Sequence, residues 1–524
     1  MPRLALTPEL PRRMAACHPA SLCLRTHNHL RRWISSQGDA TAGRSLACTW
    51  LTTTPEKITP DEILSSSPIP ELKPEHGYTP VLLVTPAFAH LVDSSHNFLE
   101  QWMNRLYSSP SDHTSRTPRH AVVAIVDRLP NNGFTAGDKT VTEADGVAIL
   151  FSKAEDIQGK VAPPRQVRAL EAEEPTLLFS FRKEVESTGD EITYRPTHEI
   201  GLRLANTIFV NGKESTLFGT RWVYDPTLKR LALEKLADLS TCVVTVNPQD
   251  IRQSLELPLH PIGERRKVIS SMGNILRQIA KHTDAQSSDP MPASAELEKE
   301  LPRYIAEHGI ADRRVSVWAL VETTADSAFA KSGYTADSLA KSIQMGGKLH
   351  RVMSGGGGWG KKQGLLSLDP ETSFHQAGST QLFTLNYILS SDADISVQET
   401  FLSCEKGPIV EDLSTLSQAA GAGDYIQFFA STEPIHTQES RLEAPKAATE
   451  RLTCHFGLVS DAETATSQAG EQRNLLIAPN FFGALSEKAI TYLQPVVGVS
   501  SNQPLLETRT KIDIPGSRVE LVLK

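Results

Sequence analysis

The chain has 524 residues, enough for two or three domains that each bury a core of their own. Hydrophobic residues make up 39% and charged residues 22%, which is ordinary for globular proteins and excludes a wholly disordered chain. The net charge of −8 is uneven, because residues 1–50 carry seven arginines against two acids, a net of +5 that leaves −13 for the remainder. So acidic a body excludes a general nucleic-acid binder and restricts any RNA contact to a local patch.

The apolar runs are short. The longest, AVVAIV (121–126) and GVAILF (146–151), fall well below the ~18 residues of a membrane-spanning helix, so no transmembrane segment is predicted. The cysteines of the body, Cys242, Cys404 and Cys454, are far apart and never occur as C-x-x-C. This spacing excludes a disulfide framework and a zinc ribbon, and no metal site is predicted.

Residues 10–36 (LPRRMAACHPASLCLRTHNHLRRWISS) interleave arginines with Leu, Ala, Met and Trp and contain no acid. This composition is typical of a mitochondrial transit peptide, whose positive amphipathic helix is drawn in by the membrane potential. We therefore predict a presequence over 1–36, cut near 32–37, and a mature protein in the mitochondrial matrix. The alternative is a basic tail without a targeting role.

The body reads as an α/β (α+β) protein of two mixed domains with strand-rich halves. Residues 37–79 are dense in Pro, Thr and Ser and predict a linker before an N-terminal domain at 80–283. A second linker is predicted at 284–294, where two prolines stand among polar residues, and the C-terminal domain at 295–524 follows it.

Periodicity predicts the elements in chain order. In the first domain we expect a strand at 81–88, a helix at 94–107 and strands at 120–127 and 146–152, then strands TLLFSF, EITYRP, NTIFVNG, TRWVYD and CVVTVN between 176 and 247, and a helix at 264–282. In the second domain we expect helices at 295–308 and 335–345 and strands at 314–322, 381–389, 424–431, 452–460, 474–479 and 518–523.

The glycine-rich block SGGGGWGKKQGLLSLDP (354–370) is the outstanding motif. Consecutive glycines free the backbone to aim N–H groups at one point, and the lysines that follow suit phosphate. The candidate anion or ligand site comprises Ser354, Gly355, Gly356, Gly357, Gly358, Trp359, Gly360, Lys361 and Lys362. The string matches G-x-x-x-x-G-K, but Lys362 replaces the hydroxyl residue that binds Mg²⁺ in a P-loop. A non-Walker ligand loop and a purely structural glycine turn are the other interpretations.

Two further patches are candidates. The first lies around an Asn-Gly pair that favours a hairpin, and its polar residues suit a small-molecule pocket: Asn206, Asn211, Lys213, Ser215, Thr216, Arg221 and Trp222. The second is a basic face on the predicted helix 264–282, where Arg265, Arg266 and Lys267 suit contact with RNA or ribosome phosphates. An exposed hairpin and a solvated helix face are the simpler interpretations of the two patches.

The blocks LANTIFVNGKESTLFGTRW and SGGGGWGKKQGLLSLDP, about 36 residues together, resemble a group of mitochondrial proteins of filamentous fungi. The order of elements over 80–152 is also similar to the start of FIST domains, which implies binding of a small ligand without fixing any site residue. No G-x-S-x-G elbow, H-E-x-x-H motif or dinucleotide fingerprint occurs. No catalytic residue or cofactor is therefore assigned.

These observations predict a non-catalytic matrix protein that binds a small ligand or a protein partner, with an accessory role in organellar gene expression as one form of that function. The alternative is a nucleotide- or phosphate-dependent enzyme that uses the loop at 354–362.

Overall fold

The computed structural model describes residues 46–66, 77–93, 97–107, 117–131, 135–136, 139–140, 142–163, 174–185, 193–206, 215–283, 289–310, 315–323, 336–355, 364–374, 381–390, 419–431, 451–460, 475–495 and 507–524. The presequence predicted at 1–36 lies outside these residues. In the part that is described, strands far outnumber helices and form mixed sheets, which confirms the predicted α+β class with strand-rich parts.

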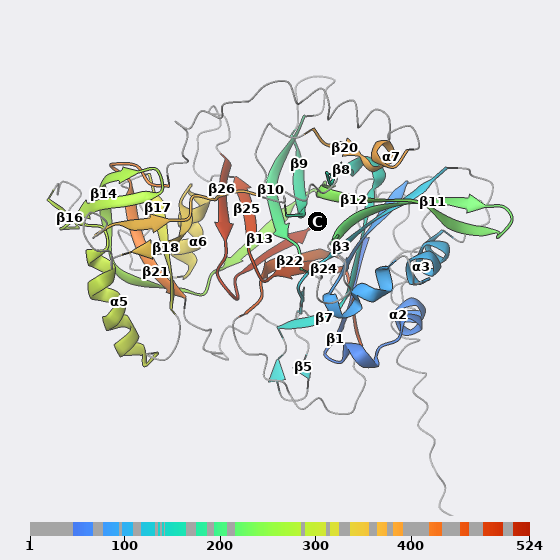
Figure 1. The fold of residues 1–524 in the computed structure, drawn as a ribbon, viewed down its shortest axis with the longest axis horizontal. Coiled ribbons are helices and arrows are strands. Elements are labelled where there is room, and N and C mark those ends of the chain that lie inside the picture. The colour runs from blue at the N-terminus through green and yellow to red at the C-terminus, as the bar shows by residue number, and fades with distance from the viewer. Residues whose placement is uncertain are drawn as a thin grey trace, which may run out of the picture.

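A large mixed sheet forms the centre of the molecule (Figure 1). Its strands follow one another in the order β23 (Leu476–Pro479), β1 (Leu46–Thr52), β7 (Glu143–Lys153), β2 (Tyr78–Val84), β3 (Arg119–Ile125), β11 (Leu217–Asp225), β12 (Arg230–Val246), β9 (Thr176–Val185), β10 (Thr193–Arg203), β25 (Ile490–Pro495) and β26 (Glu507–Ile512). Beside this path, β4 (Leu129–Pro130) pairs with β7, and β8 (Ile157–Val161) pairs with β12 and with β20 (Phe383–Thr384).

The middle of this sheet is buried on both faces, which is why its strands are continuous apolar runs. In β2, Val81 and Leu83 pack into one core while Leu82 and Val84 pack into the other. One face is covered by α2 (Pro60–Ser66), η3 (Pro86–Val92) and α3 (Phe98–Leu106). The other face packs against a four-stranded sheet of β13 (Ile251–Glu256), β27 (Arg518–Leu523), β22 (Leu452–Leu458) and β24 (Phe481–Ser486).

A closed barrel forms one end of the molecule, on the left in Figure 1. It consists of β14 (Leu259–Met272), β21 (Tyr425–Ser431), β17 (Ser316–Glu322), β18 (Lys348–Gly355), β19 (Leu366–Leu368) and β15 (Ile275–Ala280). The ring closes because β14 pairs with β21 through its first half and with β15 through its second half. Side chains such as Ile262, Leu276 and Phe428 fill the interior, as in other barrels of this size.

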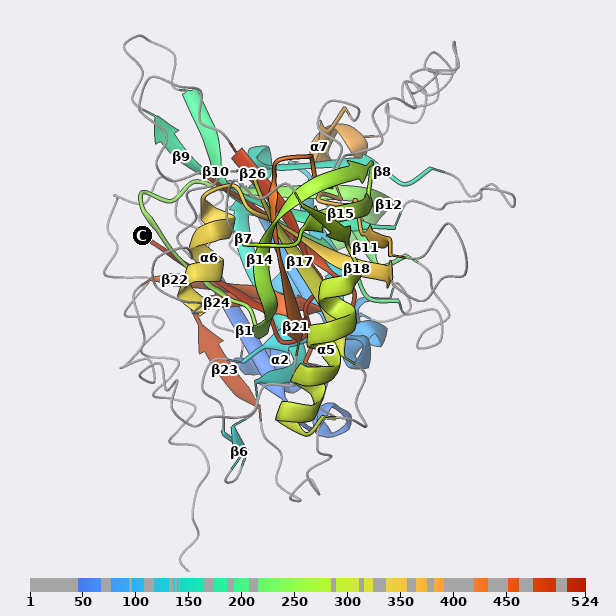
Figure 2. The ribbon, with the colours of Figure 1, turned by 90° about the vertical axis from the view of Figure 1, so that its left-hand side faces the viewer.

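Two helices accompany the barrel. Helix α5 (Ala295–His308) packs on it through Leu297 and Tyr304 and ends at Gly309, whose φ of +64° suits a glycine C-cap. Figure 2 shows α5 in front of the barrel strands. Helix α6 (Ala336–Gln344) contacts β13 and β26 and so lies between the barrel and the central sheets. The short elements are η1 (Pro55–Lys57), β5 (Thr135–Ala136), β6 (Lys139–Thr140), η5 (Ala154–Asp156), β16 (Pro290–Pro292) and α7 (Leu385–Ile388).

The linker predicted over 37–79 is wrong for its described part. Strand β1 pairs with β7 and β23 inside the large sheet, and Trp50 and Leu51 are fully buried. Helix α2 adds Ile63 and Leu64 to the core. Pro55 and Pro60 begin the short helices η1 and α2, and Thr49 and Thr52 belong to β1 itself. The abundance of these residue types obscured the apolar strand LACTWLT.

The boundary predicted at 284–294 divides a single barrel. Strands β14 and β15 precede it, yet they pair with β21 and β19, which follow it, and β16 lies within it. Strands β23, β25 and β26, which were assigned to the C-terminal domain, complete the large sheet instead. The barrel is thus an insertion between the parts of a central unit that both ends of the described chain build.

The helix predicted at 264–282 is wrong. This segment forms β14 and β15, joined at Gly273, where φ is +59°. Val268, Leu276 and Ile279 point into the barrel, whereas Met272 is 62% exposed. The apolar spacing fitted a helix, but β-bulges in this pair shift the alternation, and the Gly-Asn turn decides the outcome.

Two other local predictions also differ from the structure. The strand expected at 381–389 is only the two residues of β20. The second of them, Thr384, caps α7 because its side chain accepts a hydrogen bond from the backbone N–H of Tyr387. The hairpin expected at Asn211-Gly212 falls within 207–214, outside the described residues. The flanking strands do not pair with each other, since β10 joins β9 and β25 while β11 joins β12 and β3.

Candidate ligand-binding groove

An open groove with a volume of about 640 Å³ lies at one end of the barrel. Its walls come from the first half of α5, the start of β17, the end of β18 and the start of β19. Strands β17 and β18 are antiparallel, so the beginning of one and the end of the other meet at the same end of the barrel. The groove is in the size range of sites that take small organic ligands.

The walls of the groove are mainly apolar. The principal apolar side chains are Leu297, Leu301, Val315, Val317, Val352 and Met353. On α5, the lining positions 294, 297, 298 and 301 follow the spacing of one helix face. Met353 is 62% exposed and supplies a flexible apolar surface at the opening.

A few polar groups interrupt the apolar surface: Ser294, Glu298, Ser316, Arg351 and Ser354. The Ser294 hydroxyl donates to Glu298 Oε1 at 2.7 Å. One oxygen of this carboxylate therefore already accepts a hydrogen bond within the protein. Arg351 Nη2 donates to Ser316 Oγ at 3.3 Å, and the Arg351 side chain remains 45% exposed. Arg351 is therefore the lining cation and has further N–H groups to offer.

Behind Arg351 lies a buried carboxylate. Asp513 Oδ2 is 3.9 Å from Arg351 Nη1, and Asp513 Oδ1 accepts a hydrogen bond of 2.6 Å from Trp318 Nε1. Burial raises the pKa of Asp513 above its usual value, although the Trp318 bond and nearby Lys511 and Arg351 act against that rise. The Arg351 guanidinium lies 5.8 Å from the Trp318 ring centre, so the tryptophan positions both charged groups.

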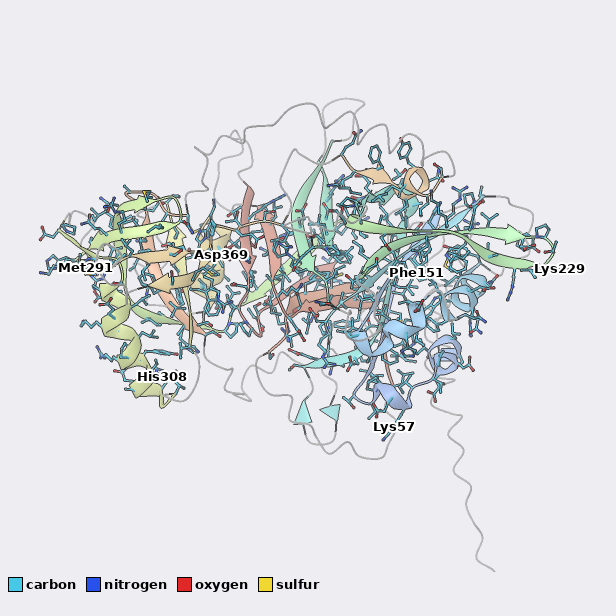
Figure 3. The ribbon with its side chains drawn as sticks, in the orientation of Figure 1. Lys57, Phe151, Lys229, Met291, His308 and Asp369 are labelled. Carbon is cyan, nitrogen blue, oxygen red and sulfur yellow. The ribbon has the colours of Figure 1, made fainter. Side chains whose placement is uncertain are left out.

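The segment 369–374, which follows β19, connects this end of the barrel to the large sheet. Lys511 Nζ on β26 lies 2.7 Å from Asp369 Oδ2 and 2.7 Å from Glu371 Oε2. Arg203 of β10 bonds Glu371 at 2.9 Å and stacks on the ring of Phe374 at 4.3 Å. Asp369 lies between the two parts of the molecule in Figure 3. This network fixes the chain that leaves the groove.

The glycine-rich block meets the groove at both of its described ends. Ser354 and Gly355 end β18, and Ser354 lines the groove. At the other described end, the carbonyl of Gly364 accepts a hydrogen bond from the Ser294 N–H at the start of α5. The rest of the predicted site, Gly356, Gly357, Gly358, Trp359, Gly360, Lys361 and Lys362, lies outside the described residues.

The second predicted patch is distributed over several structural roles. Trp222 packs in the core beneath α3 and donates to Thr220 Oγ1 at 2.9 Å, and Thr216 is also buried. Ser215 donates to Asp238 at 2.6 Å, and Arg221 pairs with Glu234 at 2.5 Å. Asn206 follows β10, while Asn211 and Lys213 lie outside the described residues.

The predicted polyanion contact falls on β14 instead of a helix. Arg265 pairs with Glu322 at 2.7 Å and lies over the ring of Tyr425 at 4.1 Å. Arg266 pairs with the buried Glu296 at 2.8 Å, and Lys267 is opposite Tyr425 in the sheet. A polyanion would have to compete with carboxylates for both arginines.

The three described cysteines and His350, which could take part in chemistry, are buried. Burial raises the pKa of the Cys242 thiol to about 12, and it also raises the pKa of Cys48 and Cys454. His350 donates from Nδ1 to the Asp369 carbonyl, and burial lowers its pKa, so its ring is neutral near pH 7. Among the described residues, no group of three or more His, Cys, Asp or Glu is placed to hold a metal ion.

Comparisons with protein-family models, curated proteins and solved structures give no match to this chain. No helix in the described ranges is long and apolar enough to cross a membrane. The groove residues on α5 and β17, together with Arg351, were not identified from sequence. The signal that pointed nearest to them was the glycine-rich block, because Arg351 precedes it by three residues and Ser354 belongs to it.

Proposed function

We propose that this protein is a non-catalytic binding protein whose groove holds a small molecule with an apolar body and a polar head. The observation that carries the proposal is the lining, in which most residues are apolar and a few are polar. This division is typical of small-molecule sites, where apolar contacts supply affinity and polar groups set orientation.

The polar groups in the groove favour binding over turnover. Its described lining holds hydroxyls, one carboxylate and one guanidinium, and it contains no histidine, cysteine or lysine. A nucleophile activated by an adjacent base, the usual arrangement for covalent catalysis, is therefore not formed by these residues. Binding is also what the FIST resemblance of 80–152 implies, although the groove lies outside that segment.

The test is a titration with the neutral apolar fluorophore N-phenyl-1-naphthylamine. Leu301→Glu places a charge in the apolar wall and is expected to weaken binding at least about tenfold, because an unpaired charge resists desolvation. The matched control is Leu228→Glu, at a leucine that is 53% exposed at the tip of the β11–β12 hairpin. Lys229, labelled in Figure 3, marks this tip far from the barrel. Absence of binding, or an equal loss in both variants, would refute the proposal.

We further propose that the protein acts in the mitochondrial matrix, where an accessory role in organellar gene expression is one setting for a ligand-binding protein. The support is the acid-free, arginine-rich composition of residues 10–36. N-terminal sequencing of the protein from isolated mitochondria tests this proposal, since import should leave a new terminus near 32–37. An intact Met1 or Pro2 there would contradict it.

A further inference from the structure

We propose that the ligand of the groove carries a carboxylate, which Arg351 binds, on an aliphatic body that lies along α5. This inference rests on the proposed ligand-binding function and names the class of ligand. It starts from the electrostatics of the lining, where Arg351 is the cation and Glu298 is the carboxylate.

Arg351 has hydrogen-bonding capacity that the protein does not use fully. Its bond to Ser316 measures 3.3 Å and its separation from Asp513 is 3.9 Å, both longer than a close charge-assisted bond. The guanidinium offers five donors in a planar fork, which matches a carboxylate in two-point contact. A carboxylate that enters the groove can therefore replace weak contacts with strong ones.

Asp513 lies close enough to orient the Arg351 guanidinium but does not occupy all of its N–H donors. Its side chain is only 9% exposed, and its Oδ1 is committed to Trp318 Nε1 at 2.6 Å. The arrangement keeps the guanidinium at the groove while Asp513 stays fixed in the interior. Ser316, which shares the groove with Arg351, supplies a hydroxyl that can donate to the same head group.

Glu298 repels a carboxylate head group less than its charge alone suggests, and it also attracts a cationic head group less. Ser294 Oγ already donates to Glu298 Oε1 at 2.7 Å, and this hydroxyl partly satisfies the carboxylate. Leu297 and Leu301 lie on the same helix face and give an aliphatic chain an apolar track. Charge complementarity therefore assigns the head of the ligand to Arg351 and its body to α5.

The experiment compares three ten-carbon ligands below the concentrations at which they form micelles: decanoate, decanol and decyltrimethylammonium. Each displaces bound N-phenyl-1-naphthylamine from the full chain. We expect decanoate to displace the probe at concentrations at least about tenfold lower than decanol, because a charge-assisted hydrogen bond is gained. We expect decyltrimethylammonium to be the weakest of the three.

Arg351→Gln should remove the preference for decanoate over decanol. The matched control is Arg303→Gln on α5, whose side chain is 67% exposed and bonded to Glu307. It should retain the wild-type preference. Unchanged thermal unfolding of both variants would show that each is folded.

Equal displacement by decanoate and decanol, or tightest binding of the cation, would overturn the carboxylate assignment. So would a preference for decanoate that survives in Arg351→Gln. In each case the neutral probe would still bind and still respond to Leu301→Glu, so the proposed function would stand. Failure of the probe itself to bind would refute both.

Discussion

At the scale of single residues, buried ionisable groups fall into those in direct contact with an opposite charge and those held mainly by neutral hydrogen-bond donors. Lys511 is of the first kind, since two carboxylates surround it and together raise its pKa despite its burial. Asp127 is of the second kind. Its Oδ2 accepts a hydrogen bond of 2.8 Å from the Glu487 N–H, but burial raises its pKa to about 6.

We predict that Asp127→Asn stabilises the protein increasingly as the pH rises from 4.5 to 8. The carboxyl has a pKa near 3.9 when unfolded and a higher one when folded, so its ionisation costs stability between those values and fully above pH 6. An asparagine oxygen accepts the same hydrogen bond without this cost. The gain at pH 8 should reach about 2–3 kcal/mol.

Thermal unfolding of wild type and variant across this pH range measures the difference. Asp250→Asn, at an ion pair with Lys524 in which the Asp250 side chain is 48% exposed, is the control and should show no such trend. A difference between wild type and Asp127→Asn that is constant with pH would contradict the prediction.

At the scale of elements, helices and strands with a strong local pattern were predicted correctly, whereas the pairing of distant strands was not predicted. Helix α5 occupies 295–308 as predicted, because its apolar periodicity and its closing glycine agree. Strands β3 and β7 lie where their apolar runs predicted them. Strand β2 covers only the first half of the strand predicted at 81–88, because Pro86 begins η3. The pairing of β1 with β23 joins residues more than 400 positions apart, and no local pattern encodes such a pairing.

The groove was missed for the same reason. Its α5 wall and its β18 wall are each ordinary in sequence, and only closure of the barrel brings them together. Arg351 occurs in the segment LHRVM, where no strand was predicted. In the structure Arg351 lines the groove, with its guanidinium near Ser316 and Asp513, and His350 is buried against the Asp369 carbonyl.

We predict that Glu296→Ala loosens α5 from the barrel. Glu296 Oε1 accepts the Glu264 N–H at 2.9 Å, and Glu296 Oε2 pairs with Arg266, whose side chain is 11% exposed. Removing one partner of a buried pair leaves an uncompensated charge, which costs roughly 3–5 kcal/mol. Urea unfolding measures this loss.

Glu307→Ala is the control on the same helix. Its pair with Arg303 is exposed on both sides, so the free energy of unfolding should fall by less than about 1 kcal/mol. Similar losses in the two variants would show that Glu296 does not anchor the helix.

At the scale of the whole molecule, the chain order and the spatial order of the two parts differ. The central unit takes strands from both ends of the described chain, and the barrel is inserted between them. The sequence instead predicted two consecutive domains, since the polar segment 284–294 has the composition of a linker. Composition identifies a turn, but it does not show which sheet the flanking strands enter.

We predict that cutting the chain within 284–288, at an introduced protease site, leaves the two pieces associated. Strand β14 on one piece pairs with β21 on the other, and β15 pairs with β19, through contacts that the cut does not break. Size-exclusion chromatography should show a single peak that contains both pieces. Separation into two independently folded fragments would restore the two-domain interpretation.

The central claim, that the groove beside α5 is the ligand site, is tested most directly by photo-crosslinking with a decanoate analogue that carries a diazirine. Mass spectrometry of the digested protein then locates the label. We predict labelling within 294–302 and 351–354, suppressed by excess decanoate and reduced in Leu301→Glu. Labelling confined to other segments, or scattered labelling that decanoate does not suppress, would contradict the claim.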